Sequence, residues 1–312
     1  MKLLKFYNEI NKIIKKTWKN NYGKILIILF ILMLLCNFMK DNQIETFNSS
    51  KKFIEKHNDS LYDNFYVNIY DQLVYDENKN KFEYDEIKHA AKINKNSTVL
   101  DIGSGLGHHV NLFNNNKIHA IGMDKSKHMI NAANKKYPKS KFILGDALNT
   151  IQFQPSTYSH ILSLYFTLYY IKDKRLFFKN CYDWLIPGGK LVIHLVNRNK
   201  FDPIINAGNP LNMVSPQKYA KDRITESVVK FNDFKYKSKF FLDKENDSAT
   251  FKETFINDND KSVRQNNHTL YMDTQKNILN QAINMGFILE GKIDMTKAQY
   301  EYQYLYVLKK PN

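Results

Sequence analysis

The chain has 312 residues, of which 43% are hydrophobic and 14% aromatic, so it is too apolar for a disordered protein and long enough to bury a sizeable core. Its formal net charge is +15, but seven lysines lie in the basic segment 1–24 and the remaining lysines and arginines are scattered, which disfavours a nucleic-acid partner. Two cysteines exclude a disulfide framework or a cysteine metal site, and the histidines lack metal-ligand spacing, so we expect no metal.

Residues 25–39, ILIILFILMLLCNFM, carry no charge and are flanked by Lys24 and Lys40. This run is slightly shorter than the roughly 20 residues that cross a bilayer, but flanking lysines can reach the interface. It predicts a single-pass transmembrane helix, followed by a polar linker at 40–52. A cleaved signal peptide is the main alternative, although the small-residue cleavage pattern is missing. The positive-inside rule favours a cytoplasmic N-terminus.

From residue 97 onward, short apolar runs alternate with stretches of helical spacing, a pattern typical of an α/β domain with a parallel sheet covered on both faces. Strands are expected at 98–102, 118–123, 141–144, 160–165 and 190–196, and helices at 106–115, 126–136 and 174–185. A last unit should contain a helix at 274–285 and strands at 287–293 and 302–308. We therefore assign residues 53–312 to one domain.

The residues between 201 and 272 follow a different period, with alternating apolar and polar side chains around residues 234–238 and 250–256. Alternation is typical of half-buried strands. We expect an antiparallel β insertion over 201–272.

The sequence VLDIGSGLG at 99–107 is an apolar strand that runs through Asp101 into a glycine turn and then a helix. Gly103, Gly105 and Gly107, with Ser104 between the first two, let the backbone approach a ligand, and the helix N-terminus favours an anionic group. The spacing differs from the dinucleotide pattern G-x-G-x-x-G. A tight turn without a ligand is the alternative.

Two further acidic residues follow later strands. Asp124 ends the next strand, about 20 residues past the glycines, where a carboxylate can accept ribose hydroxyls. Asp146 stands beside Ala147 after the third strand. Either aspartate alone could be a helix cap, but two in register with the glycine turn predict one ligand site.

These features, together with LIPGGKLVIHLV at 185–196, resemble class I S-adenosylmethionine-dependent methyltransferases over roughly residues 84–196. The resemblance implies a Rossmann-like seven-stranded sheet whose last strand is antiparallel, and S-adenosylmethionine as cofactor. It implies that Asp101 and the turn from Gly103 to Gly107 hold the methionine end, Asp124 the ribose, and Asp146 with Ala147 the adenine. Tyr158 and Ser159 stand where the family often has Phe-Asp.

Methyl transfer from a sulfonium needs mainly alignment, and a base only if the nucleophile arrives protonated. His194 at the end of the fifth strand is a candidate base, with an interior histidine as the alternative. Tyr165, Tyr169 and Tyr170 follow the fourth strand. We expect Tyr165 to take part in catalysis and Tyr169 to contact the substrate, with core packing as the alternative for all three.

The segment HLVNRNKFD at 194–202 and the C-terminal YEYQYLYVLKK are similar to the glycine N-methyltransferase branch. This resemblance implies that Arg198 grips the anionic group of a small-molecule acceptor, which suits its bidentate guanidinium. A surface arginine is the alternative. A lipid-like, protein or nucleic-acid acceptor, and a non-catalytic S-adenosylmethionine-binding protein, remain open as functions.

Overall fold

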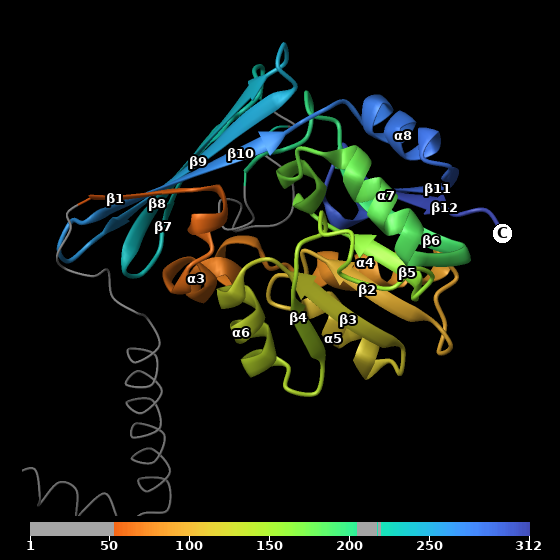
Figure 1. Ribbon diagram of the computed structural model, residues 1–312. Helices are drawn as coiled ribbons and strands as arrows, with labels where there is room; N and C mark the ends of the chain where they lie inside the picture. Colours follow the sequence, from red (N-terminus) through yellow and green to blue (C-terminus); the bar gives the residue numbers. More distant parts are fainter. Residues whose placement is uncertain (1–52, 205–216, 218–219) are drawn as a thin grey trace, which may run out of the picture. The chain divides into compact units, whose positions relative to one another are not determined.

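The computed structural model describes residues 53–204, 217 and 220–312, which form two sheets with their covering helices (Figure 1). The predicted membrane anchor at 25–39, with the basic segment before it and the linker after it, lies outside the described residues. Within the described ranges, we find no helix with the length and apolarity that a membrane span requires.

The larger sheet has seven strands in the order β11-β12-β6-β5-β2-β3-β4. Its strands are β2 (Thr98–Ile102), β3 (His119–Asp124), β4 (Lys141–Leu144), β5 (Tyr158–Ser163), β6 (Leu185–Val196), β11 (Ile288–Asp294) and β12 (Gln303–Lys309). Strands β2, β3, β4, β5 and β6 are parallel to one another, whereas β12 runs antiparallel to both β6 and β11. The predicted Rossmann-like sheet with an antiparallel last strand is therefore confirmed.

Helices cover both faces of this sheet because its strands are apolar on both sides. The helices are α4 (Glu77–Ala90), α5 (His108–Asn115), α6 (Lys127–Lys136), α7 (Lys174–Trp184) and α8 (Gln275–Asn284). On β2, Leu100 packs into the core that α7 and α8 complete, while Val99 packs into the core on the side of α4 and α5. Alternate residues of a strand point to opposite faces, so a continuous apolar run gives two cores.

The smaller sheet has five strands in the order β1-β10-β9-β8-β7. They are β1 (Phe53–His57), β7 (Glu226–Lys230), β8 (Phe234–Asp243), β9 (Ser248–Asn257) and β10 (Val263–Tyr271). Strands β7 to β10 are antiparallel to their neighbours, as the predicted insertion requires. Strand β1 pairs parallel to β10. It was not predicted, because this edge strand has no fully buried residue and so a weak pattern.

Helix α3 (Asn64–Val74) follows the short helix η1 (Asn58–Leu61) and lies between the smaller sheet and the loop after β2 (Figure 1). Tyr66, Ile69 and Leu73 pack against the smaller sheet, whereas Val67 contacts Leu106 and Met129 beside that loop. An amphipathic helix with two apolar sides can join two layers. Helix α3 therefore covers the carboxyl ends of the first strands.

Arg264 of β10 ties the start of α3 to the smaller sheet. Its guanidinium donates to Asp63 (2.9 Å) and to the carbonyl of Leu61 (3.1 Å), and it lies over the ring of Phe65. Asp63 also caps α3 by accepting from the backbone N–H of Tyr66. A buried arginine with this many acceptors fixes both partners in place.

Candidate active site

The loop between β2 and α5 adopts backbone angles that glycine tolerates and other residues rarely adopt. Gly103, Gly105 and Gly107 all have positive φ, at 71°, 53° and 83°. The N–H groups of Gly103 and Ser104 donate to the carbonyl of Met123 at 2.8 and 3.0 Å, which holds the loop against β3. The predicted glycine turn is thus a fixed part of the sheet's carboxyl edge.

The three glycines differ in what surrounds them. A Cβ at Gly103 would lie 2.5 Å from the side chain of Thr167, and a Cβ at Gly107 would lie 2.4 Å from the ring of Phe142. At Gly105 the nearest atom within range would be a ring carbon of Tyr70, at 3.9 Å. Gly103 and Gly107 are therefore required by packing, whereas Gly105 borders open space that a ligand can occupy.

Asp124 at the end of β3 is hydrogen-bonded to the glycine loop. Its carboxylate accepts from the N–H of Gly105 (3.0 Å) and of Ser126 (2.8 Å). Burial raises its pKa, an effect that these backbone hydrogen bonds oppose. A carboxylate has about four lone-pair sites, so Asp124 can still accept from a ligand's hydroxyl groups.

Asp146 and Ala147 follow β4. The carboxylate of Asp146 is exposed and accepts from the N–H of Leu148 at 2.8 Å, while the carbonyl of buried Ala147 accepts from the side chain of Asn180 at 2.9 Å. Both residues line the same cleft as Asp101, Gly103, Ser104, Gly105 and Asp124. Gly107 is not among the lining residues and acts through the shape of the loop.

Two polar groups at the base of this cleft fit the methionine end of S-adenosylmethionine. Asp101 is buried, no donor among the described residues hydrogen-bonds its carboxylate, and burial raises its pKa to about 7. The hydroxyl of Ser104 is buried and has no hydrogen-bond partner there. Buried polar groups are normally paired, so a ligand with an ammonium group and a carboxylate would complete both.

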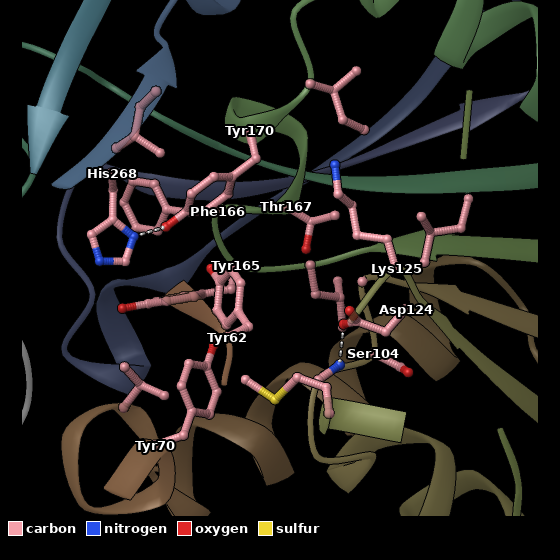
Figure 2. Close-up of a pocket in the computed structure, with 18 of the residues that line it drawn as sticks. Tyr62, Tyr70, Ser104, Asp124, Lys125, Tyr165, Phe166, Thr167, Tyr170 and His268 are labelled. Atoms are coloured by element: carbon pink, nitrogen blue, oxygen red, sulfur yellow. Dashed lines mark hydrogen bonds between the residues drawn. The ribbon is translucent and has the colours of Figure 1, made fainter. Parts of the chain in front are cut away.

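The cleft has a volume of about 510 Å³ and continues from the loop to the smaller sheet. Tyrosine rings fill the space between. Figure 2 shows Tyr62, Tyr70 and Tyr165 between Asp124 on one side and His268 on the other. The ring centroids of Tyr62 and Tyr70 lie 6.5 Å apart, and those of Tyr62 and Tyr170 lie 6.3 Å apart. The wall that faces the cofactor loop is therefore aromatic with phenol groups.

Tyr170 of this wall begins a hydrogen-bonded series of three side chains. The hydroxyl of Tyr170, on the short helix η2 (Thr167–Tyr170), lies 2.7 Å from Nδ1 of His268. Nε2 of His268 lies 2.8 Å from Glu253, which is 1% exposed. Glu253 also accepts from the hydroxyl of Tyr236 (2.9 Å) and from Asn266 (3.2 Å). All three members of the series line the cleft.

Of the three residues expected to act on the acceptor, one lines the cleft and two lie in the core. Tyr165 lines the cleft and has a φ of 51°, a strained value for a bulky residue. His194 is fully buried and is not a lining residue; burial lowers its pKa to about 4. Tyr169 is also buried, and its hydroxyl accepts from the N–H of Val196 at 2.8 Å. His194 and Tyr169 thus lie in the core, which was the alternative interpretation for both.

Arg198 is not among the residues that line the cleft. Its guanidinium pairs with Asp247 and donates to the carbonyl of Met272 at 2.6 Å, and its side chain is 11% exposed. These contacts join the end of β6 to the smaller sheet. The structure therefore corrects the expected position of Arg198: it lies outside the cleft, and its terminal NH1 group donates within the protein rather than to an acceptor.

Sequence reasoning missed Tyr62, Tyr70, Glu253 and His268. The spacing of Tyr62, Tyr66 and Tyr70 by four residues was a helical signal, although Tyr62 precedes the helix. Glu253 and His268 occupy inward positions on strands β9 and β10, where Glu253 pairs with Asn266 and His268 with Phe251, two positions along on the same face. A polar residue at an inward strand position is the signal that could have identified them.

Comparison with known proteins agrees with this geometry. Residues 100–193 match the family described as a methyltransferase domain. Over 159 residues the chain is 32% identical to the phosphoethanolamine N-methyltransferase of Plasmodium falciparum (isolate 3D7), a match that covers 48% of this chain and 58% of that enzyme. The chain therefore matches little more than half the length of this relative.

Solved structures share the fold at low identity. The CcbJ methyltransferase of Streptomyces caelestis superposes with a TM-score of 0.62 at 14% identity, covering 81% of this chain and 99% of that chain. S-adenosylmethionine-bound CalS10 of Micromonospora echinaspora, an amino pentose methyltransferase, has a TM-score of 0.53 at 16% identity, covering 74% and 90%. Residues 100–193 therefore match an S-adenosylmethionine-dependent methyltransferase domain, which takes S-adenosylmethionine as cofactor, and the described residues share the fold of solved enzymes of this kind.

Proposed function

We propose that this protein transfers the methyl group of S-adenosylmethionine to the nitrogen of a small amine. The observation that carries the proposal is the wall opposite the glycine loop, where Tyr62, Tyr70, Tyr165 and Tyr170 line the cleft together with buried Glu253. Aromatic faces attract cations, most strongly where water is excluded. A carboxylate behind such faces adds to the attraction for an ammonium group.

The charge of the cleft supports a cationic acceptor. Carboxylates outnumber lysines among its lining residues by seven to three. Groups of both signs are paired: Lys79 with Glu83, Lys125 with Asp59, and Asp71 with Lys136, which does not line the cleft. Since one sign of charge in a cleft raises the local concentration of the opposite sign, amines are favoured over simple anions.

The amine that we test first is phosphoethanolamine, since the similar Plasmodium enzyme bears that substrate in its name. The anionic group of such an acceptor would not be held by Arg198, which does not line the cleft and pairs with Asp247. Lys172, an exposed residue at the rim of the cleft, is the third lysine and is available to a phosphate group.

S-adenosylmethionine supplies a methyl carbon bonded to a positively charged sulfur. Asp101, Ser104 and the backbone of Gly105 would hold its methionine end, and Asp124 its ribose. What remains for the protein is to align the amine, exclude water and leave the nitrogen with a free electron pair.

The test incubates the full chain with methyl-labelled S-adenosylmethionine and phosphoethanolamine, ethanolamine or ethylene glycol monophosphate, in which a hydroxyl replaces the amine. Label should appear in N-methylated products of an amine and be absent from the glycol ester. Asp124→Ala is the matched control and should lose transfer through loss of cofactor binding. Calorimetric binding of S-adenosylmethionine without transfer to any amine would refute the proposed acceptor class and favour a binding protein.

We also propose that residues 25–39 anchor the protein in a membrane. The support is the uncharged apolar run itself, since burying large apolar side chains contributes roughly 1.5 to 3 kcal/mol each. Alkaline carbonate should leave the full-length chain in the membrane fraction, and deletion of residues 1–45 should release it. Extraction of the full-length chain by carbonate would contradict the anchor.

A further inference from the structure

We propose that Tyr170, His268 and Glu253 form a proton relay that takes a proton from the acceptor amine before methyl transfer. This inference rests on the proposed function, because only an acceptor that arrives as an ammonium ion needs a base. The family match covers Tyr170 but ends at residue 193, whereas Glu253 and His268 lie in the smaller sheet. No sequence motif joins the three residues.

The neighbours of His268 determine the direction of its hydrogen bonds. Burial alone would raise the pKa of Glu253, but its side-chain hydrogen bonds, including those from Tyr236 (2.9 Å) and Asn266 (3.2 Å), favour the ionised form, so Glu253 remains a carboxylate. A carboxylate only accepts. Nε2 of His268 must therefore carry the hydrogen that it shares with Glu253, which leaves Nδ1 of the neutral ring as the acceptor for the hydroxyl of Tyr170.

Helix η2 places Tyr170 close to the cofactor loop. Its first residue, Thr167, fills the space beside Gly103, and its last residue, Tyr170, bonds to His268. Tyr170 therefore belongs to the same 3₁₀ turn as a residue that packs directly on the glycine loop. Tyr62 and Tyr70 continue the ring contacts from Tyr170 to the open space at Gly105.

The step moves one proton along two hydrogen bonds. An N–H proton of the ammonium group passes to the oxygen of Tyr170 as the phenol proton passes to Nδ1 of His268, forming an imidazolium paired with Glu253. The nitrogen keeps the electron pair, which forms the bond to the methyl carbon, while the carbon–sulfur pair stays on sulfur. Burial raises the pKa of Tyr170 well above its usual value, so the phenol can pass a proton on but does not stay ionised.

Among the described groups that face His268, only Glu253 carries a charge that would stabilise an imidazolium. Tyr66 of α3 has its ring centroid 6.0 Å away, Tyr170 approaches from η2, and Glu253 comes from β9. Tyr236 of β8 reaches the histidine through Glu253. Among these described neighbours, Glu253 is the only carboxylate, and it lies on the side away from Tyr170.

The experiment compares His268→Gln and Tyr170→Phe with the wild type, using phosphoethanolamine and methyl-labelled S-adenosylmethionine. His119→Gln, an exposed histidine at the start of β3, is the control and should behave as wild type. Near neutral pH both relay variants should lose about 100-fold in kcat, with cofactor affinity unchanged by calorimetry. The loss should shrink as the pH approaches about 10, where amines deprotonate without help.

A loss that is equal at every pH would show a structural role and overturn the relay, as would a kcat within twofold of wild type in Tyr170→Phe. Nitrogen NMR of the histidines in the full chain with S-adenosylhomocysteine gives a readout that needs no acceptor. The relay requires a proton on Nε2 of His268, and a proton on Nδ1 alone would exclude it. If the wild type methylates no amine, the proposed function fails by that result alone, independently of the tautomer.

Discussion

The carboxyl edge of the seven-stranded sheet and the inner face of the five-stranded sheet both line the cleft, yet they carry different kinds of group. The first offers the glycine loop, which is open at Gly105, and the carboxylates of Asp101 and Asp124, all within a short stretch of chain. The second offers rings and the Glu253–His268 pair, contributed by strands, α3 and η2 from distant parts of the chain. The donor side is thus a local structure and the acceptor side a tertiary one.

This difference predicts different effects of substitution on the two sides, and also within the glycine loop. Gly107→Ala should have the largest effect, because a Cβ there would meet the ring of Phe142 at 2.4 Å and φ is 83°. We expect the free energy of unfolding to fall by about 2 to 5 kcal/mol, measured by urea denaturation. Gly105→Ala, its matched control, should lose less stability but more cofactor affinity. Equal stability of both variants would contradict the division of roles.

Asp124→Ala should weaken S-adenosylmethionine about tenfold or more, since hydrogen bonds to a charged group contribute roughly 1.5 to 3 kcal/mol. The same change should leave the tautomer of His268 as in wild type, because the two groups belong to different sheets. Calorimetry and nitrogen NMR check the two halves of this expectation. Asp124→Asn, which keeps an acceptor oxygen, should lie between. Unchanged affinity in folded Asp124→Ala would place the cofactor elsewhere.

Asp101 should make cofactor binding depend on pH. Its pKa is raised to about 7 from 3.8, so between these values the native state binds more protons than the unfolded state. In the cofactor-free protein the stability contribution of this carboxyl group therefore falls as pH rises through that window. An ammonium group needs the ionised form, so affinity should decrease by up to about tenfold per pH unit below 7. Asp101→Asn should bind more weakly with a flat profile; a steep profile in that variant would exclude Asp101.

Arg198→Ala gives the smallest expected effect. The arginine pairs with partly exposed Asp247, so the unfolding free energy should fall by only about 1 kcal/mol. The Michaelis constant for phosphoethanolamine should stay within twofold of wild type. A tenfold rise of that constant, with normal cofactor affinity, would instead restore Arg198 as the residue that grips the acceptor.

The same contrast explains what the sequence could predict. The glycine turn, Asp124 and Asp146 follow strands whose apolar runs are unambiguous, and parallel strands bring their carboxyl ends together, so one cleft followed from local patterns. His268 and Glu253 required the pairing of β9 with β10 and their packing on α3, which single-strand alternation does not specify. His194 and Tyr169 were placed at the correct strand ends, but which face a side chain takes was not determined by its position along the chain.

Helix η2 links the binding of the methyl donor to the binding of the acceptor. Thr167 is packed on Gly103 of the donor loop, and Tyr170 is bonded to His268, with only two residues between them. A substitution within η2 displaces both contacts, so its effects on donor and acceptor constants should be coupled rather than additive. Substitutions on β9 or β10 that leave His268 in place do not touch either contact. New acceptor preferences can therefore be selected in the smaller sheet without altering how the methyl donor is held.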